Sequence, residues 1–226
     1  HWTFGANGAV QLGDDWRIKA SYGEGFKAPT LYQLYGFGGN LNLQPEESRS
    51  YEAGVELGNR NAALHFAATV FQRDATNQID YVWPAGYFNT RRTRATGIEL
   101  EGGARVDENL VLRAAYAHIK ATNRITGKDL ARRPRDLLTL SADWTTPLER
   151  LTLGADLRLA GDSFDDAGNF TALDGYGLVT LRAALPIGEK FELFGRVENL
   201  TDESYQTAAG YGTYGRSAYA GVRVKW

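Results

Sequence analysis

The sequence contains no cysteine and no methionine, and only six prolines occur in 226 residues. Without cysteine, the chain can form neither a disulfide framework nor a thiolate metal site. No apolar run reaches the roughly 18 residues that a transmembrane helix needs. The net charge of −2 provides no basic field, so nucleic acid is not an expected partner. The start at His1 lacks an initiator methionine and a signal peptide, so we expect a mature or truncated piece.

Aromatic residues and glycine, by contrast, are plentiful. Twelve tyrosines, ten phenylalanines, five tryptophans and 26 glycines favour β-structure. Apolar side chains also recur at every second position over whole segments, which is the period of a strand with one apolar face. This alternation predicts eleven strands, in the segments 2–12, 16–22, 51–57, 64–70, 98–105, 110–116, 138–144, 151–158, 179–185, 191–198 and 218–226.

The connections between these strands alternate in length. Short turns are expected at residues 13–15, 58–61, 106–109, 145–150 and 186–190. Long loops are expected at about 25–48, 74–94, 121–135, 160–174 and 201–214. Bacterial outer-membrane barrels have this asymmetry, with short periplasmic turns and long external loops. A soluble β-sandwich would also show alternating strands, but it does not explain connections sorted so regularly by length.

The apolar faces of the predicted strands suit a lipid environment. A charge at mid-bilayer costs roughly 2–4 kcal/mol, and the central parts of these faces carry none. Two polar exceptions, Gln72 and His118, fall near loop ends, where the cost is smaller. We therefore predict an all-β fold, a transmembrane antiparallel β-barrel in contact with outer-membrane lipid.

Aromatic residues lie beside the short turns, where a periplasmic interfacial girdle is expected. They are Trp16, Trp144, Phe191 and Trp226. The last segment, 219–226, alternates and ends in an aromatic residue, Trp226. This segment resembles the C-terminal signal recognised by the barrel-assembly machinery, which is therefore an expected partner.

The odd number of strands indicates that further sequence completes the barrel. Predicted strands one and eleven run in the same direction, so they cannot close an antiparallel barrel with each other, and an open edge in lipid is not tolerated. Eleven is half of 22, the size of plugged outer-membrane transporters, although mitochondrial barrels with odd strand numbers exist. We expect residues 1–226 to be the C-terminal part of a 22-stranded barrel domain, without its plug and N-terminal strands.

Three motifs are similar to those of TonB-dependent outer-membrane receptors. They are the segments YGEGFKAPTLYQLYG at 22–36, NLQPEESRSYEAGVE at 42–56 and VENLTDESY at 197–205. Within that superfamily the chain most resembles the vitamin B12 (cobalamin) transporters. This closer resemblance lies in FKAPTLYQLYGFGGN at 26–40, NQIDY at 77–81, LARRPRDLL at 130–138 and GYGTYGR at 210–216.

The resemblance implies energised uptake of a large, scarce nutrient across the outer membrane of a Gram-negative bacterium. Cobalamin is the expected cargo, and the TonB complex is expected to act through the missing plug. The matching positions imply that Phe37, Arg132 and Tyr211 contact cobalamin. Tyr35 and Tyr87 join them as candidates, since aromatic side chains with polar tips suit a large, partly apolar ligand. No cofactor is expected, and no metal either, because the calcium sites of that family lie in earlier strands.

Three alternatives stay open at this point. A ferric siderophore or haem receptor would keep the fold and change the cargo, whereas a passive porin would lack the plug.

Catalysis is not expected, because no serine motif flanks either His65 or His118, and the third histidine is His1. Charged side chains on the other strand face predict either a hydrated wall of ion pairs or a docking surface for a plug domain.

Overall fold

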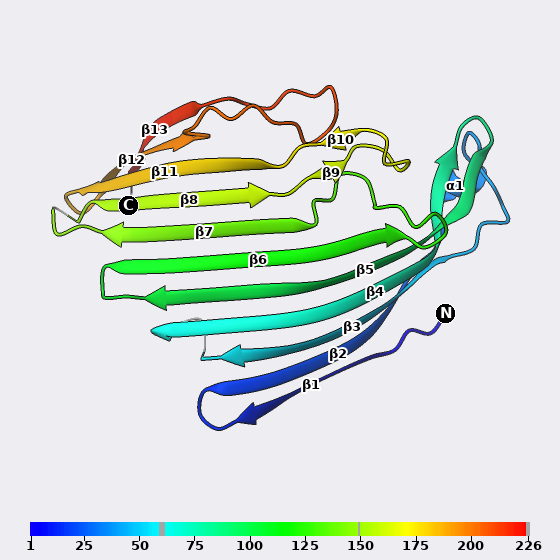
Figure 1. The fold of residues 1–226 in the computed structure, drawn as a ribbon, viewed down its shortest axis with the longest axis horizontal. Coiled ribbons are helices and arrows are strands. Elements are labelled where there is room, and N and C mark those ends of the chain that lie inside the picture. Colours follow the sequence, from blue (N-terminus) through cyan, green and yellow to red (C-terminus); the bar gives the residue numbers. More distant parts are fainter. Residues whose placement is uncertain (59–61, 149, 225–226) are drawn as a thin grey trace.

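The computed structural model describes residues 1–58, 62–148 and 150–224. Figure 1 shows a curved, open sheet in which antiparallel strands follow one another in chain order. The eleven strands of this sheet are β1 (Gly5–Leu12), β2 (Trp16–Lys27), β3 (Glu46–Leu57), β4 (Leu64–Val82), β5 (Gly86–Arg105), β6 (Leu110–Asn123), β7 (Asp136–Thr145), β8 (Thr152–Ala160), β11 (Tyr176–Ile187), β12 (Phe191–Glu198) and β13 (Ser217–Val224). The predicted all-β antiparallel fold and its eleven strands are confirmed.

Two small elements lie in the long connections. The short helix α1 (Leu31–Tyr35) follows β2, and β9 (Ser163–Phe164) pairs with β10 (Ala172–Leu173) in a separate hairpin after β8. Among the described residues, no helix is long and apolar enough to cross a membrane. The short connections β1–β2, β5–β6 and β11–β12 lie at one edge of the sheet, which we call the turn end. The long loops and the tip of the β4–β5 hairpin lie at the other edge (Figure 1), which we call the loop end.

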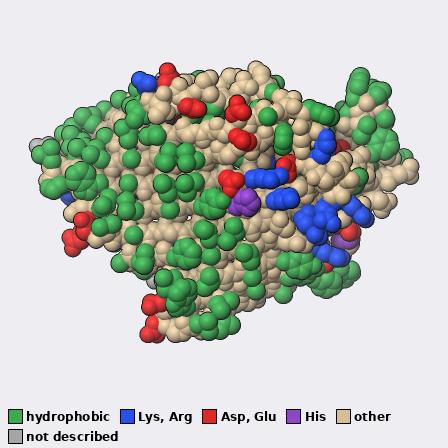
Figure 2. Space-filling model, in the orientation of Figure 1, with side chains coloured by type: hydrophobic (Ala, Val, Ile, Leu, Met, Phe, Trp, Pro, Cys, Tyr) green, Lys and Arg blue, Asp and Glu red, His purple; other side chains and the backbone are tan. Residues whose placement is uncertain are grey.

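Strand register places the alternating apolar residues on one continuous face. Directly opposite residues in an antiparallel pair point to the same side. Ile18 pairs with Val55, Val55 with Ala68, and Ala68 with Leu100. The same row continues from Leu100 to Tyr116. Figure 2 shows this face, on which hydrophobic side chains cover the strands toward the turn end.

This apolar face has no partner layer within the described chain. The only buried hydrophobic side chains among the described residues are Leu43, Ala121, Ala160 and Leu173, and no large side chain is fully buried. Large apolar residues such as Val10, Val70 and Val222 are instead exposed. A soluble sandwich would pack a second layer against such a face. The main apolar face of the described sheet is therefore left uncovered by the rest of the described chain.

The opposite face carries ion pairs between neighbouring strands. Arg182 donates two hydrogen bonds to Asp156, at 2.7 and 3.0 Å, and also lies 3.1 Å from Asp143. Asp143 in turn pairs with Arg113 at 2.7 Å. Further along, Arg223 pairs with Glu192. The predicted polar face thus carries ion pairs that join neighbouring strands.

The predicted turns agree with the structure where it describes them. Strands end and begin around residues 13–15, 106–109 and 188–190 as expected, whereas 59–61 and 149 lie outside the described residues. Trp16, Trp144 and Phe191 are exposed beside these turns. Trp226 lies outside the described residues, so the proposed assembly signal stays a prediction.

The predicted long loop at 74–94 is wrong. β4 and β5 continue as paired strands to a tight turn at 83–85, and Tyr81 pairs with Tyr87. The pairing shifts register between Ala75 and Ile79, where Asn77 adopts a positive φ of 56°. A bulge of this kind breaks the side-chain alternation. Because alternation was the only signal for strands, the extension of this hairpin could not be seen in the sequence.

Candidate functional site

The tip of the long β4–β5 hairpin carries a group of aromatic side chains. It projects past the rest of the sheet at the loop end, and the segment 28–45 with α1 lies beside it (Figure 1). The aromatic tip is the name we give to Tyr81, Trp83 and Tyr87 of the hairpin together with Tyr32, Tyr35 and Phe37 of the segment 28–45. Three of the five predicted site residues therefore belong to one structural unit.

Backbone contacts fasten the segment 28–45 to the hairpin. The Tyr87 amide donates to the Gly38 carbonyl at 2.9 Å, and the Asn40 side chain donates to the Tyr87 carbonyl at 3.0 Å. Asn89 exchanges two hydrogen bonds of 2.8 Å with the backbone of Gln44. Gly86 has a φ of +109°, and a methyl group there would collide with the Gly38 carbonyl. The two segments can approach so closely only because both positions are glycine.

Tyr87 is the centre of the ring contacts in this group, and the other rings are more exposed. The Tyr81 and Tyr87 ring centroids are 5.0 Å apart, and the Tyr32 and Tyr87 centroids are 6.3 Å apart, both pairs edge-on. Tyr87 is half-buried, whereas Tyr35 and Phe37 are 72% and 73% exposed. Tyr87 thus serves as a support, and Tyr35 and Phe37 are available to a ligand.

A second group joins three other loops, and we call it the three-loop junction. It consists of Arg132 from loop 121–135, Asp165 from loop 160–174, and Ala209 with Tyr211 from loop 201–214. The Arg132 Nε lies 2.7 Å from Asp165 Oδ1, and the Ala209 amide donates to the same oxygen at 3.0 Å. One carboxylate therefore connects all three loops.

Electrostatics stabilises the ionised form of that carboxylate. The hydrogen bond from Arg132 and then the Ala209 amide hold the pKa of Asp165 below its usual range. The same pair raises the pKa of Arg132, and Tyr211 contributes a weaker electrostatic effect on it. Backbone amides, first that of Thr171, lower the pKa of the neighbouring Asp166. The junction is thus a fixed arrangement of charges with an exposed arginine.

The structure brings the five predicted site residues together in two groups rather than one. Tyr35, Phe37 and Tyr87 belong to the aromatic tip, while Arg132 and Tyr211 belong to the junction. Among the described residues, no hydrogen bond, ion pair or ring contact joins the two groups. Both lie at the loop end of the sheet (Figure 1).

Sequence reasoning missed the residues that hold these groups in place. Asp165 and Asn89 were not candidates, although each makes several of the contacts between loops. The pair Asp165-Asp166 before Gly168-Asn169 is a pattern typical of turns. It could have indicated a structured loop, but nothing in the sequence linked it to Arg132.

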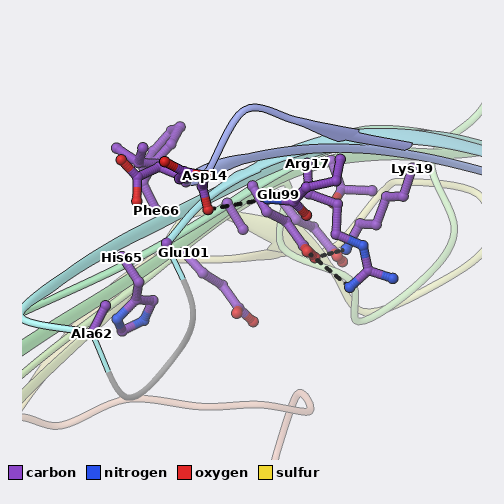
Figure 3. Close-up of a pocket in the computed structure, with 15 residues that line it drawn as sticks. Asp14, Arg17, Lys19, Ala62, His65, Phe66, Glu99 and Glu101 are labelled. Atoms are coloured by element: carbon purple, nitrogen blue, oxygen red, sulfur yellow. Dashed lines mark hydrogen bonds and ion pairs between the residues drawn. The ribbon is translucent and has the colours of Figure 1, made fainter. Parts of the chain in front are cut away.

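A polar pocket of about 570 Å³ lies at the turn end of the charged face. Glu56 there accepts from Lys19 at 2.7 Å and lies 3.7 Å from Arg17. Figure 3 shows Arg17 and Lys19 together on one side, with His65 and Glu101 away from them. The pocket is part of the charged wall, and its lining contains no serine beside His65.

Comparison with known proteins decides the family. Residues 1–200 match the family described as "TonB dependent receptor-like, beta-barrel". This chain belongs to the TonB-dependent receptor β-barrel family. TonB-dependent receptors are outer-membrane proteins of Gram-negative bacteria that act in transport, and the family is not one of enzymes.

Solved structures confirm the barrel fold of this TonB-dependent receptor chain. The ferric-catecholate import receptor Fiu from E. coli K12 has a TM-score of 0.78 at 19% identity, over 97% of this chain and 34% of its own. The siderophore receptor PiuA from Acinetobacter baumannii has a TM-score of 0.80 at 21% identity, over 99% of this chain and 36% of its own. The ferric yersiniabactin uptake receptor FyuA from Yersinia pestis has a TM-score of 0.78 at 19% identity, over 98% of this chain and 37% of its own. This chain spans about a third of each.

Proposed function

We propose that residues 1–226 form part of the barrel wall of a TonB-dependent active transporter that imports a large, scarce nutrient. The observation that carries this proposal is the continuous apolar face across eleven registered strands, with the aromatic tip and the three-loop junction both at the loop end. Such a sheet requires lipid on one side, and its edges at β1 and β13 require further strands. In this proposal 22 strands surround a separate plug domain.

The polar face supports a rigid wall rather than a moving part. Its ion pairs connect adjacent strands, as Arg182 does between Asp143 and Asp156. A network with balanced charges offers a hydrated surface against which a plug can be held and released. In the proposed cycle, the loops bind the nutrient outside and the TonB complex moves the plug from the periplasm. The wall keeps its shape throughout.

Cobalamin is the cargo that we propose first. The support is the resemblance of four loop segments to cobalamin transporters together with the properties of the matching side chains. Phe37 and Tyr211 are 73% and 71% exposed, so both can cover an apolar part of a large ligand. The guanidinium of Arg132 is held by Asp165 at 2.7 Å and can still donate to a ligand oxygen.

A ferric siderophore is the second candidate cargo. Fiu, PiuA and FyuA are named for ferric-catecholate, siderophore and ferric yersiniabactin import, although their identities to this chain of 19–21% support the fold alone. Exposed aromatic rings beside an arginine would also suit an anionic iron chelate. The two cargoes therefore have to be separated by direct binding.

The deciding experiment is a titration of the purified full-length receptor with cyanocobalamin and with ferric siderophores, including a ferric catecholate. Phe37→Ala, Arg132→Ala and Tyr211→Ala are each expected to weaken cobalamin binding about fivefold or more. Tyr214→Ala is the matched control, because Tyr214 lies in the same loop as Tyr211 and is 88% exposed. Tight siderophore binding without cobalamin binding would establish the second candidate. A lack of any plug in the complete protein would contradict both.

A further inference from the structure

The loop between β12 and β13 begins with the motif VENLTDESY at 197–205. Only its first two residues belong to the barrel wall, because β12 ends at Glu198. The loop runs out toward the β9–β10 hairpin and returns to β13, which begins at Ser217 (Figure 1). We call residues 199–208 its outgoing leg and residues 209–216 its return leg. Since most of the motif lies outside the wall, its role concerns the shape of this loop.

Two side chains of the motif tie the legs together at the base of the loop. Asn199 donates to the Glu203 carbonyl at 2.9 Å and to the Tyr214 carbonyl at 3.3 Å, and its own oxygen accepts from the Glu203 amide at 2.8 Å. Asp202 accepts from the Arg216 amide at 2.7 Å. We call Asn199 and Asp202 the loop clamp. Both of its bonds to the return leg go to backbone groups, so the clamp fixes the path of the chain.

The backbone at the loop clamp has a conformation that few residue types adopt. Asn199 and Asp202 have positive φ angles of 49° and 59°. Asparagine and aspartate enter this left-handed region more readily than other residues with a side chain. Asn199 is also buried, with 5% of its surface exposed, so its amide needs the partners that the two legs supply. Residue type, burial and backbone shape at these positions all serve the closure of the loop.

The clamped loop carries one part of the three-loop junction at its tip. A further bond between the legs, from the Thr213 hydroxyl to the Tyr205 carbonyl at 2.7 Å, lies between the clamp and the tip. At the tip the Ala209 amide donates to Asp165 at 3.0 Å, and Tyr211, two residues further on, is exposed. Tyr211 therefore has a defined place at the junction only while the two legs stay together.

We propose that Asn199 and Asp202 are positioning residues for cargo binding, which hold the loop in the shape that presents Tyr211 to the ligand. This proposal rests on the proposed function, because Tyr211 contacts a ligand only in that function. The clamp residues act through the loop and not by touching the cargo. A loop that is ordered before the cargo arrives loses less entropy on binding than a loose one, so the clamp raises affinity through preorganisation.

The test is a titration of the purified full-length receptor with cyanocobalamin, or with a ferric catecholate if that is the cargo it binds. Asp202→Gly permits the positive φ but removes the acceptor, so it should weaken binding about fivefold, and Asn199→Gly at least as much. Asp202→Asn keeps an acceptor oxygen and should stay within about twofold of the wild type. Ser204→Gly is the matched control, because it adds a glycine to the same loop at an exposed position outside the clamp.

A second arm separates positioning from general stability. If the clamp acts through Tyr211, Asp202→Gly should cost little further affinity in a receptor that already carries Tyr211→Ala. An equal loss in both backgrounds would overturn the proposal. So would a loss in Ser204→Gly, or in Asp202→Asn, as large as that in Asp202→Gly. Unchanged strand content by circular dichroism confirms that the variants are folded.

Amide exchange in the cargo-free receptor distinguishes failure of the clamp from failure of the proposed function. Asp202→Gly should speed exchange at residues 205–213, above all at the Ala209 amide, whereas Ser204→Gly should not. Unchanged exchange in Asp202→Gly would overturn the clamp whatever the cargo. A receptor that bound neither cobalamin nor a ferric siderophore would lose the cargo assignment, while faster exchange in Asp202→Gly would still support the clamp.

Discussion

Placing an arginine at the centre of the apolar face tests whether that face lies in lipid. Leu140 is the position of choice, because it lies mid-strand in β7 and pairs with Ala114 and Leu157 on the apolar face. It is 39% exposed, so an arginine can be accommodated without creating a clash inside a packed core. Any cost of Leu140→Arg then reflects the medium that surrounds the side chain.

The expected cost follows from the depth of the position. An arginine on the lipid face costs about 2–4 kcal/mol at the midplane and about 0–1 kcal/mol near the interface. Leu140→Arg should therefore reduce the folding equilibrium constant about 30- to 900-fold. Ile187→Arg, on the same face but at the turn end of β11, should cost little. Ser141→Arg should cost little too, because Ser141 faces the other way and pairs in register with Asp156.

The assay is reversible unfolding in guanidinium of the full-length receptor in lipid vesicles, followed by tryptophan fluorescence. The free energy of unfolding should be highest for the wild type and slightly lower for Ile187→Arg and Ser141→Arg. It should be much lower for Leu140→Arg. If Leu140→Arg cost no more than Ser141→Arg, the apolar face would not be in lipid. The proposed membrane wall would then be wrong, and a missing protein layer would have to cover this face.

Three further predictions concern the loops and the wall. Gly86→Ala should destabilise the contact between the hairpin tip and the segment 28–45 by about 1–3 kcal/mol. Faster protease cleavage of the segment 28–45 would measure that loss. Nutrient binding, measured by titration, should also weaken. The Arg132–Asp165 contact should persist above the ordinary carboxyl pKa and be lost as pH falls through the lowered pKa of Asp165, seen as faster amide exchange in the junction. Arg182→Gln should destabilise the barrel by about 1 kcal/mol or less, and less still at high salt.

Each of these has an outcome that contradicts it. Unchanged cleavage and affinity in Gly86→Ala would mean that the close backbone approach does not position the aromatic tip. Asp165→Asn should remove the acid transition in exchange, and a transition that persisted would assign it to another group. A salt-independent loss of stability in Arg182→Gln would indicate lost packing rather than lost charge pairing.

The strands and their apolar faces can be predicted from the sequence, because they depend on local alternation of side chains. A strand with lipid on one side and water on the other must alternate, so segments such as 138–144 and 191–198 showed both their existence and their faces. Turn lengths were equally local, and the turn at 13–15 was placed correctly. Alternation fails at Asn77, where a bulge shifts the register, so the sequence pattern predicts a loop where the structure has a hairpin.

The loop contacts were decided only by the folded chain. Arg132 and Asp165 are 33 positions apart, and no local pattern relates them. Gly38 and Gly86 meet only because β4 and β5 extend far enough to present the hairpin tip to the segment 28–45. The sequence by itself therefore determined the wall, because lipid imposes a period of two on every strand. The tertiary structure decided the two ligand groups, because contacts between distant loops follow from strand register and leave no periodic signal in the chain.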